Sequence, residues 1–364
     1  MPKTRIGLDI GSTAVRAAEL TDGSPPSVVR AAQVPLPVGA VENGEVRDVE
    51  AVAEVLRELW SPQHGGFKSR KVWMGVGNQR VVVREIALPS MPEKELRQSL
   101  GFQVQEFIPM PVDEAVLDYH LIEELEIEGR PMLRLLLVAA QKAMVDTLVA
   151  AATSAKLEPM GLDLVPFALV RAVGSTGAGM ELETTGGEAV VDVGAHVTNI
   201  VVHAAGETRF VRILPSGGRD ITLAIARGMS VEDDVAERLK RGDVGDDRVP
   251  MSEGGNGIAR QLAQASEIAM QRATQFVDEI RSSLEFYTAQ TQGARIERLL
   301  ISGGGSKLDG FIDILRQRIP VTVEPGRVFS RVGSKLSLSE GAQAEAEPLL
   351  ATAVGLAIPW GGGS

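Results

Sequence analysis

Leu8-Asp9-Ile10-Gly11-Ser12-Thr13 is matched about half a chain later by Val191-Asp192-Val193-Gly194-Ala195-His196-Val197-Thr198. In each copy an apolar strand runs into an acid, a glycine and a turn that carries a hydroxyl. An acid at a strand end can hold a cation, and glycine lets backbone N–H groups approach a phosphate without a Cβ in the way. The repeat therefore predicts a nucleotide clamped between two related halves.

A third glycine element supports this interpretation, because a single Asp-x-Gly after a strand is also a common structural turn. Leu299-Leu300-Ile301-Ser302-Gly303-Gly304-Gly305-Ser306-Lys307-Leu308 predicts a buried strand that opens through three glycines into a helix. Such a turn lets a flat or phosphorylated group approach the backbone closely, with a helix N-terminus behind it. The chain contains no P-loop motif, and these glycines lack the spacing of a dinucleotide fingerprint.

Composition narrows the class of protein. The chain has 364 residues, 44% of them hydrophobic and 23% charged, which is typical of globular proteins of about two to three domains. A formal charge of -11 disfavours nonspecific binding to nucleic acid, so a nucleotide would be held locally by amides and a metal. The chain has no cysteine, which excludes disulfides and thiolate zinc sites. Without a signal-peptide pattern or a stretch that could span a bilayer, we expect a cytosolic protein.

The first part of the chain predicts an α/β layer. A helix is expected over 48–59, and strands are expected over 5–10, 14–20, 28–36, 72–76 and 81–86. From about Leu88 the pattern changes to helix, strand, strand and helix, expected over 93–107, 116–124, 132–140 and 142–156. We interpret 88–158 as a small α+β domain inserted into the first α/β domain. A continuous single domain is the alternative.

The second part repeats the strand-turn-strand plan after a Gly-, Ser- and Thr-rich connection over 174–187. Strands are expected over 188–193, 198–204 and 208–214, and helices over 221–227 and 231–240. A loop is expected over 242–257, and its acids lack the ligand register of an EF-hand. Residues 258–292 contain no glycine or proline and predict a long helix or a broken pair, packed on its own domain rather than in a coiled coil.

The two hairpins and the glycine turn together resemble the actin-like ATPase superfamily, which includes actin, the heat-shock 70 chaperones, the sugar kinases and the division protein FtsA. The resemblance implies a first phosphate loop over 6–15, a second over 190–198 and an adenosine loop over 299–308. Residues 353–357 look like the second connecting helix of that superfamily. Residues 234–241 are similar to its Ala-Glu-x-x-Lys helix, which would place Glu237 and Lys240 by the adenosine; an amphipathic surface helix is the alternative.

The fold implied by this resemblance is α/β, with duplicated actin-like (ribonuclease H-like) domains and a small inserted α+β subdomain. The expected first domain combines 1–87 with 159–180, and the insertion covers 88–158. The expected second domain combines 181–220 with 290–364. A helical subdomain on the nucleotide side would cover 221–289.

The resemblance also implies bound ATP or ADP with Mg²⁺. Asp9 and Asp192 would flank the metal through its waters, since magnesium uses few protein carboxylates. These two acids and Asp163 are the candidates for a catalytic role. The other expected nucleotide-binding residues are Gly11, Ser12, Thr13, Gly194, Thr198, Gly217, Gly218, Glu237, Lys240, Gly303, Gly304, Gly305 and Lys307.

Hydrolysing members of the superfamily orient the attacking water with a Gln or Glu on the first connecting helix. Where the chaperones have Glu before Pro, this chain has Val165-Pro166. A valine can neither orient nor deprotonate water. We therefore expect ATP to be bound tightly and hydrolysed slowly, so that the chain is at most a slow ATPase.

Within the superfamily, three stretches resemble the type IV pilus assembly protein PilM family: 102–114 with its Ile-Pro-x-Pro turn, 279–287, and 302–308. This resemblance covers nearly the whole chain. It implies an adaptor at the cytoplasmic face of the inner membrane that binds the N-terminal cytoplasmic tail of the membrane protein PilN and links it to the pilus motor. The tail would dock between the first domain and the insertion, with Phe102, Phe107 and Ile108 as apolar anchors; core packing is the alternative for each.

Other functions of the same fold stay open at this point. An FtsA-like filament-forming or division-related actin homologue is the main alternative, and self-association is compatible with the sequence. The tail over 356–364 is too short and too broken for the amphipathic membrane helix of FtsA, so we expect no direct membrane insertion. A sugar or acid kinase would need a carboxylate base facing a small substrate, which no segment indicates.

Overall fold

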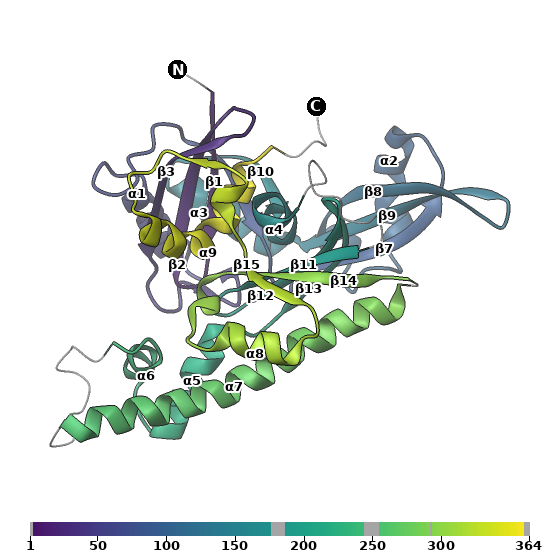
Figure 1. Ribbon diagram of the computed structural model, residues 1–364. Coiled ribbons are helices and arrows are strands. Elements are labelled where there is room, and N and C mark those ends of the chain that lie inside the picture. Colours follow the sequence, from purple (N-terminus) through teal and green to yellow (C-terminus); the bar gives the residue numbers. More distant parts are fainter. Residues whose placement is uncertain (1–2, 176–185, 244–254, 292, 360–364) are drawn as a thin grey trace.

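Two open sheets, each carrying one of the acid-glycine hairpins, pack on the same pair of helices (Figure 1). The computed structural model describes residues 3–175, 186–243, 255–291 and 293–359. The two helices are α4 (Val165–Val173) and α9 (Glu340–Ala357). Their apolar residues form one core cluster with residues from both sheets. The cluster joins the two halves of the molecule.

The first sheet has the order β10-β6-β1-β2-β3-β16. Its strands are β1 (Thr4–Ile10), β2 (Ala14–Thr21), β3 (Ser27–Pro35), β6 (Lys71–Val76), β10 (Glu158–Leu164) and β16 (Gly333–Ser334). A two-stranded hairpin, β4 (Val41–Glu42) and β5 (Glu45–Val46), precedes helix α1 (Val49–Leu59). Asp48 caps α1 by accepting a hydrogen bond from the Ala51 amide at 2.9 Å.

The second sheet repeats the topology of the first. Its strands are β11 (Gly186–Val193), β12 (Thr198–Ala204), β13 (Glu207–Leu214), β14 (Arg295–Ser302) and β15 (Thr322–Pro325). The order β13-β12-β11-β14-β15 matches β3-β2-β1-β6-β10, with an antiparallel three-strand meander followed by two parallel strands in each case. The duplication predicted from the repeated motif is therefore present in the strand order.

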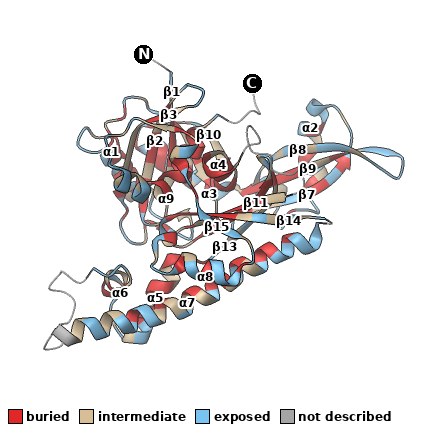
Figure 2. Ribbon diagram, in the orientation of Figure 1, coloured by how far each residue is buried: buried red, intermediate tan, exposed pale blue. Residues whose placement is uncertain are grey.

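The helices of the second half share one core cluster with its sheet, although the helix over Asp233–Lys240 packs on two other helices rather than along the sheet (Figure 1). They are α5 (Gly218–Met229), α6 (Asp233–Lys240), α7 (Gly255–Gln290) and α8 (Phe311–Arg318). The stretch predicted as a long helix or a broken pair is one continuous helix, α7, with 36 residues. Figure 2 shows buried residues on the side of α7 that packs on the sheet and exposed residues on the other. Most of the predicted loop over 242–257 and of the connection over 174–187 lies outside the described residues.

The inserted unit is a three-stranded sheet of order β7-β9-β8, formed by β7 (Val81–Pro89), β8 (Ala115–Ile127) and β9 (Arg130–Gln141). Helix α2 (Glu93–Val104) packs on it, and a 3-10 turn covers Val112–Glu114. The helix ends three residues earlier than expected. Strand β7, expected in the first sheet, pairs with β9 along its whole length.

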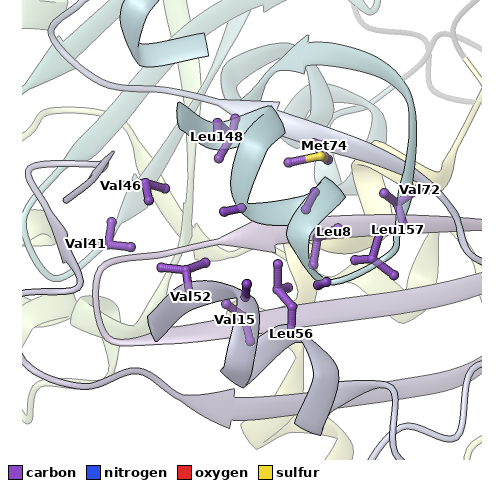
Figure 3. Close-up of a cluster of buried hydrophobic side chains, with 14 of the residues drawn as sticks. Leu8, Val15, Val41, Val46, Val52, Leu56, Val72, Met74, Leu148 and Leu157 are labelled. Carbon is purple, nitrogen blue, oxygen red and sulfur yellow. The ribbon is translucent and has the colours of Figure 1, made fainter. Parts of the chain in front are cut away.

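Helix α3 (Lys142–Ser154), expected to close the insertion, belongs to the core of the first half. Its buried Leu148 lies in the same cluster as Leu56 of α1 and Met74 of β6 (Figure 3). Sheet pairing and core packing thus limit the insertion to about 81–141, compared with the predicted 88–158.

Two glycines permit the close packing of the connecting helices. A Cβ on Gly7 of β1 would lie 1.9 Å from the carbonyl oxygen of Ala353, and one on Gly355 of α9 would lie 1.9 Å from that of Ala168. Any side chain at either position would push α9 away from the first sheet or from α4. The contacts of α9 with β1 and with α4, which connect the two halves, are therefore tightly packed.

Candidate nucleotide site

The two acid-glycine hairpins have the same backbone geometry. Gly11 donates its amide hydrogen to the Ala14 carbonyl at 3.1 Å, and Gly194 donates to the Val197 carbonyl at 3.0 Å. Across the first ladder Asp9 faces Arg16, and across the second Asp192 faces Asn199. Antiparallel partners point to the same face of a sheet. Each acid therefore shares its face with one polar residue of the following strand.

The two acids influence each other electrostatically. Burial raises the pKa of Asp9, and the guanidinium of Arg16, 3.6 Å away, opposes that rise. Burial and then the charge of Asp9 raise the pKa of Asp192 to about 7, although Arg16 and a hydrogen bond from Ser302 act in the other direction. The two hairpins thus bring two partly buried carboxylates together, and the charge of Arg16 opposes the rise in the pKa of both.

This charge balance suits a cation held between the hairpins. The described residues include no cluster of three or more His, Cys, Asp or Glu side chains that could hold a metal ion directly. Two carboxylates acting through water fit magnesium, which keeps much of its hydration shell. Asp9 and Asp192 would hold such an ion, and its charge would neutralise both the carboxylates and a polyphosphate.

The glycine loop lies directly against the second hairpin. Gly303 has φ +86°, and a Cβ there would lie 2.3 Å from the Val193 carbonyl oxygen; one on Gly305 would lie 2.4 Å from Val193 Cγ1. After Gly303 the chain forms a 3-10 turn (Gly304–Lys307) before α8, rather than entering a helix directly. Glycine is therefore needed at both positions for the loop to pack directly on Val193 of the second hairpin.

Helix α5 begins at the same place. The Gly218 amide donates to the Gly194 carbonyl at 3.0 Å, and a Cβ on Gly217 would lie 2.5 Å from that oxygen. A Cβ on Gly218 would be 3.7 Å from Gly305 Cα and 3.8 Å from Lys240 Nζ. The structure thus places Gly217, Gly218, Gly305 and Lys240 around the second hairpin.

Glu237 and Lys240 are paired with each other beside α5. Lys240 Nζ donates to Glu237 Oε2 at 2.6 Å, to the Thr222 hydroxyl at 2.8 Å and to the Gly218 carbonyl at 3.0 Å. Burial lowers the pKa of Lys240 against the effect of Glu237. Burial would raise the pKa of Glu237, but Lys240 and hydrogen bonds from Lys240, Thr222 and Arg241 hold it below its ordinary value. Both side chains are thus hydrogen bonded within the protein, close to the glycine loop over 303–307.

Three predicted site residues have structural partners instead. Thr198 is fully buried and donates its hydroxyl hydrogen to the Ser216 carbonyl at 2.8 Å. Lys307 pairs with Glu345 of α9 and lines a cavity of about 230 Å³ with it. Asp163 pairs with Arg171 of α4, which also donates to the Gly355 carbonyl of α9 at 3.0 and 3.1 Å. Asp163 thereby ties β10 to both connecting helices.

Burial divides the three predicted partner-binding residues. Phe102 of α2 is 87% exposed and Phe107, in the turn after it, is 36% exposed. Ile108 is buried with Leu96, Leu100 and Val104 in the core of the insertion. The two phenylalanines are therefore exposed to a binding partner, whereas Ile108 packs in the core of the insertion.

Sequence reasoning missed Arg16 and the β4–β5 hairpin. At the tip of that hairpin, the Asn43 amide donates to His196 Nδ1 of the second hairpin at 3.1 Å, and Asn78 donates to the Gly44 carbonyl at 2.8 Å. The signal was available, because Asn43-Gly44 lies within an alternating Val-Glu-Asn-Gly-Glu-Val stretch, and Asn-Gly in such a pattern indicates a two-residue hairpin. The first half therefore contacts the second at the turn of the second hairpin.

Comparisons with known proteins agree with this architecture. The family model for Type IV pilus assembly protein PilM matches residues 7–251, and the model for cell division protein FtsA matches residues 189–355. FtsA from Bacillus subtilis (strain 168) is 24% identical over 264 residues, or 65% of this chain. That match covers 57% of the FtsA chain, so the chain spans little more than half the length of this curated relative.

Solved structures with the same fold include a PilM-PilN type IV pilus biogenesis complex, with TM-score 0.80, 28% identity and 97% of both chains covered. EutJ from Carboxydothermus hydrogenoformans has TM-score 0.56 and 16% identity, covering 98% of this chain and 90% of its own. MreB 5 of Spiroplasma citri bound to AMPPNP has TM-score 0.51 and 13% identity, covering 97% and 94%. The last two show the fold alone, and with the first they confirm the predicted actin-like architecture. The PilM family model matches well over half of the residues of this chain, so the chain belongs to the type IV pilus assembly protein PilM family.

Proposed function

We propose that this protein is an ATP-binding adaptor of the type IV pilus assembly machinery. It binds the N-terminal cytoplasmic tail of the inner-membrane protein PilN and links it to the pilus motor. The observation that carries this proposal is the match, over 97% of both chains, to a solved PilM-PilN complex. Within the described residues, no helix has the length and apolarity to cross a membrane. A membrane-protein partner would hold the adaptor at the cytoplasmic face of the inner membrane.

The nucleotide would lie between the two hairpins. Backbone amides of Ser12 and Thr13 would face its phosphates from the first half, within the turn that the Gly11 amide closes, and the turn closed by the Gly194 amide would face them from the second. Arg16 lies beside this turn, since its Nη1 is 3.3 Å from the position of a Cβ on Gly11. The glycine loop with Glu237 and Lys240 would border the adenosine.

Hydrolysis would be slow because the position that starts the first connecting helix is apolar. Val165 is buried at the beginning of α4, and the nearby Asp163 is bound by Arg171. Neither side chain is free to take a proton from water. Single-turnover hydrolysis as fast as that of an active ATPase would contradict this part of the proposal.

A thermal-shift titration with Mg·ATP tests the nucleotide site. A ligand that binds only the folded protein raises its melting temperature by mass action. Asp9→Ala should abolish this shift, whereas Asp313→Ala, at an exposed acid of α8, should keep it. An equal shift in all three proteins would show that the nucleotide does not bind between the hairpins.

A binding titration with a synthetic PilN tail tests the adaptor role. The tail would dock between the first α/β domain and the inserted sheet, against Phe102 and Phe107. Truncating an aromatic anchor typically costs about 2 kcal/mol, or roughly 30-fold in affinity. We expect Phe102→Ala to weaken binding in this way. Phe286→Ala, at an aromatic of α7 that is 45% exposed, is the matched control, and a greater loss there would place the tail elsewhere.

The FtsA match over 189–355 makes filament formation the second function to test. Both families share the fold, so only a measurement of assembly separates them. Sedimentation of the purified protein with and without ATP should show no pelleting if the adaptor proposal is right.

A further inference from the structure

Strand β8 forms an open edge of the inserted sheet. In the order β7-β9-β8 it pairs with β9 on one side, and no other strand in the described parts of the chain pairs with its second side (Figure 1). The opposite edge, β7, lies against β13 of the second half. Strand β8 has 13 residues, so it presents a long row of backbone groups with which a further strand can pair.

The backbone of β8 shows which amides face the open edge. The Tyr119 amide donates to Oδ1 of Asp118, on its own strand, at 2.9 Å, so it is directed away from β9. Inward and outward amides alternate along an antiparallel strand, so Leu117 and Leu121 direct theirs the same way. A register shift between Leu121 and Glu123 ends this regular run. Residues 115–121 are therefore the segment suited to a new strand.

Exposed apolar side chains accompany this edge. Val116 and Leu121 are each 43% exposed. They lie on opposite faces of the sheet, because the register between them is uninterrupted and side chains alternate along a strand. A single strand laid along the edge has side chains on both faces and would cover both residues. A long edge with exposed apolar side chains is a surface on which another strand pairs.

The charges along β8 decide what kind of segment fits. Between Asp113 and Glu128 the chain has seven acids and no lysine or arginine. Two copies of β8 paired with each other would bring like charges together across the strands, which is destabilising. A basic segment would form pairs of opposite charge and would be attracted to the edge from a distance. The charge pattern therefore favours a basic partner over a second copy of the chain.

The partner in the proposed function supplies such a segment. Cytoplasmic segments close to a membrane span carry an excess of Lys and Arg. The exposed surface of α2 also leads to β8, since the chain passes from Phe107 to Ala115 through residues 108–114, and Arg97 of α2 lies 3.9 Å from Asp118. A tail held against α2 can continue along the edge of β8.

We propose that the basic cytoplasmic tail of the partner binds as a fourth strand along residues 115–121 of β8. The inference rests on the proposed adaptor function and specifies how the tail is held. The outward amides of Leu117, Tyr119 and Leu121 donate to carbonyl groups of the tail. Tyr119 thereby releases the Asp118 carboxylate, which accepts a basic side chain of the tail instead.

An N-methyl scan of a synthetic PilN tail, titrated against the whole chain, tests the backbone contacts. Each peptide replaces one amide hydrogen with a methyl group and keeps all side chains. We expect affinity to fall about fivefold or more at every second position of the paired segment and less than twofold at the positions between, because only alternate amides bond to β8. Losses without this alternation would overturn the inference.

Two variants at one position test the same contacts from the protein side. Leu121→Pro removes an outward amide, and an edge strand tolerates proline where its N–H faces solvent. Leu121→Ala truncates the same side chain and keeps the amide. The proline variant should bind the tail about fivefold more weakly than the alanine variant, and equal affinities would overturn the inference. The scan decides the question if the proline variant unfolds.

Charge reversal tests the choice of a basic occupant. Glu126→Lys, on β8, should slow association of the tail about threefold or more at low salt, and the difference should shrink in 1 M salt. Glu54→Lys, at an exposed acid of α1, changes the net charge equally and should have less than half that effect. Equal effects would overturn the role of the β8 acids. A wild type that does not bind the tail would instead overturn the adaptor function itself.

Discussion

The first and second hairpins differ in the residue that faces the acid. Both have the same strand register and the same closing bond from a glycine amide. Asp9 faces the cation Arg16, whereas Asp192 faces the neutral Asn199. The two hairpins therefore share a backbone geometry but differ in charge. Asp9 has a cation within its own hairpin, whereas Asp192 depends on a cation from outside its hairpin.

This difference explains why the pKa of Asp192 rises to about 7. In the nucleotide-free protein its negative charge lies beside Asp9, and the guanidinium of the opposite hairpin and a hydrogen bond from Ser302 offset the effect only in part. A magnesium nucleotide would change that balance, because the cation would face both acids. We therefore expect binding of a cation to stabilise the second hairpin more than the first.

The largest effect is expected from Asp192→Asn. The pKa of Asp192 is higher in the folded than in the unfolded protein, so its contribution to stability is full below about pH 4 and is lost as the pH rises through about 7. Removing the carboxyl should raise the free energy of unfolding at pH 8 by about 4 kcal/mol at most, since one pKa unit corresponds to about 1.4 kcal/mol. Urea unfolding at pH 5 and pH 8 in a chelating buffer measures this change.

Asp9→Asn is the matched control, because it removes the acid that has a cation partner. It should stabilise the protein less than Asp192→Asn at pH 8, because Arg16 offsets part of the cost of burying Asp9 and the substitution leaves Arg16 without its ion pair. An equal gain from both variants would mean that the hairpins are electrostatically equivalent.

A smaller effect, of opposite sign, is expected from Arg16→Met. Breaking a buried ion pair costs roughly 3–5 kcal/mol, and this pair is slightly exposed, so we expect a loss of about 3 kcal/mol at pH 8. The same urea titration measures it. Asp192→Asn should stabilise this variant by more than it stabilises the wild type, because without Arg16 the repulsion between the two acids is no longer offset; additive effects of the two substitutions would contradict a shared electrostatic site.

The local elements of the site were predictable from the sequence. Each hairpin depends on a glycine and an apolar strand within a few residues, and the long helix α7 depends on a stretch without helix breakers. These signals do not depend on distant partners. The repeated motif also predicted the duplication that the two strand orders display.

The boundaries of the insertion depend on residues that are distant in the sequence, and the observed boundaries differ from the predicted ones. Strand β7 has the same alternating pattern as a strand of the first sheet, but it pairs with β9, about 50 residues later. Helix α3 follows β9 directly in the chain, yet its apolar side packs in the cluster that holds α1. The sequence of β7 does not specify which strand it pairs with, and the sequence of α3 does not specify which core it packs in.

Side-chain partners were the least predictable part of the candidate site. The spacing of the glycine loop gives no information on whether Lys307 turns toward a nucleotide or toward Glu345 of α9. The ladder register was likewise needed to place Arg16 opposite Asp9 and Asn199 opposite Asp192. The asymmetry between the hairpins therefore emerged only with the structure.

The smallest effect concerns the contact that joins the halves at the turn of the second hairpin. His196 accepts the Asn43 amide hydrogen through Nδ1, which requires that nitrogen to be unprotonated. Burial, and then the charge of Arg219, lower the pKa of His196, while Glu42 and Asp220 act in the other direction. A folded pKa below the unfolded value means that this contribution is present at neutral pH and is lost as the pH falls.

Replacing His196 with Phe should therefore cost about 1 kcal/mol at pH 8, the value of a single hydrogen bond, and less at pH 5. The sharpest measurement is the hydrogen-exchange protection of the Asn43 amide, corrected for its intrinsic rate at each pH. Protection should fall in the wild type between pH 8 and pH 5 and should be low at both values in the variant. Protection that is independent of pH in the wild type would mean that contacts within the first half, such as those of Asn78 and Arg80, are enough to fix the β4–β5 hairpin.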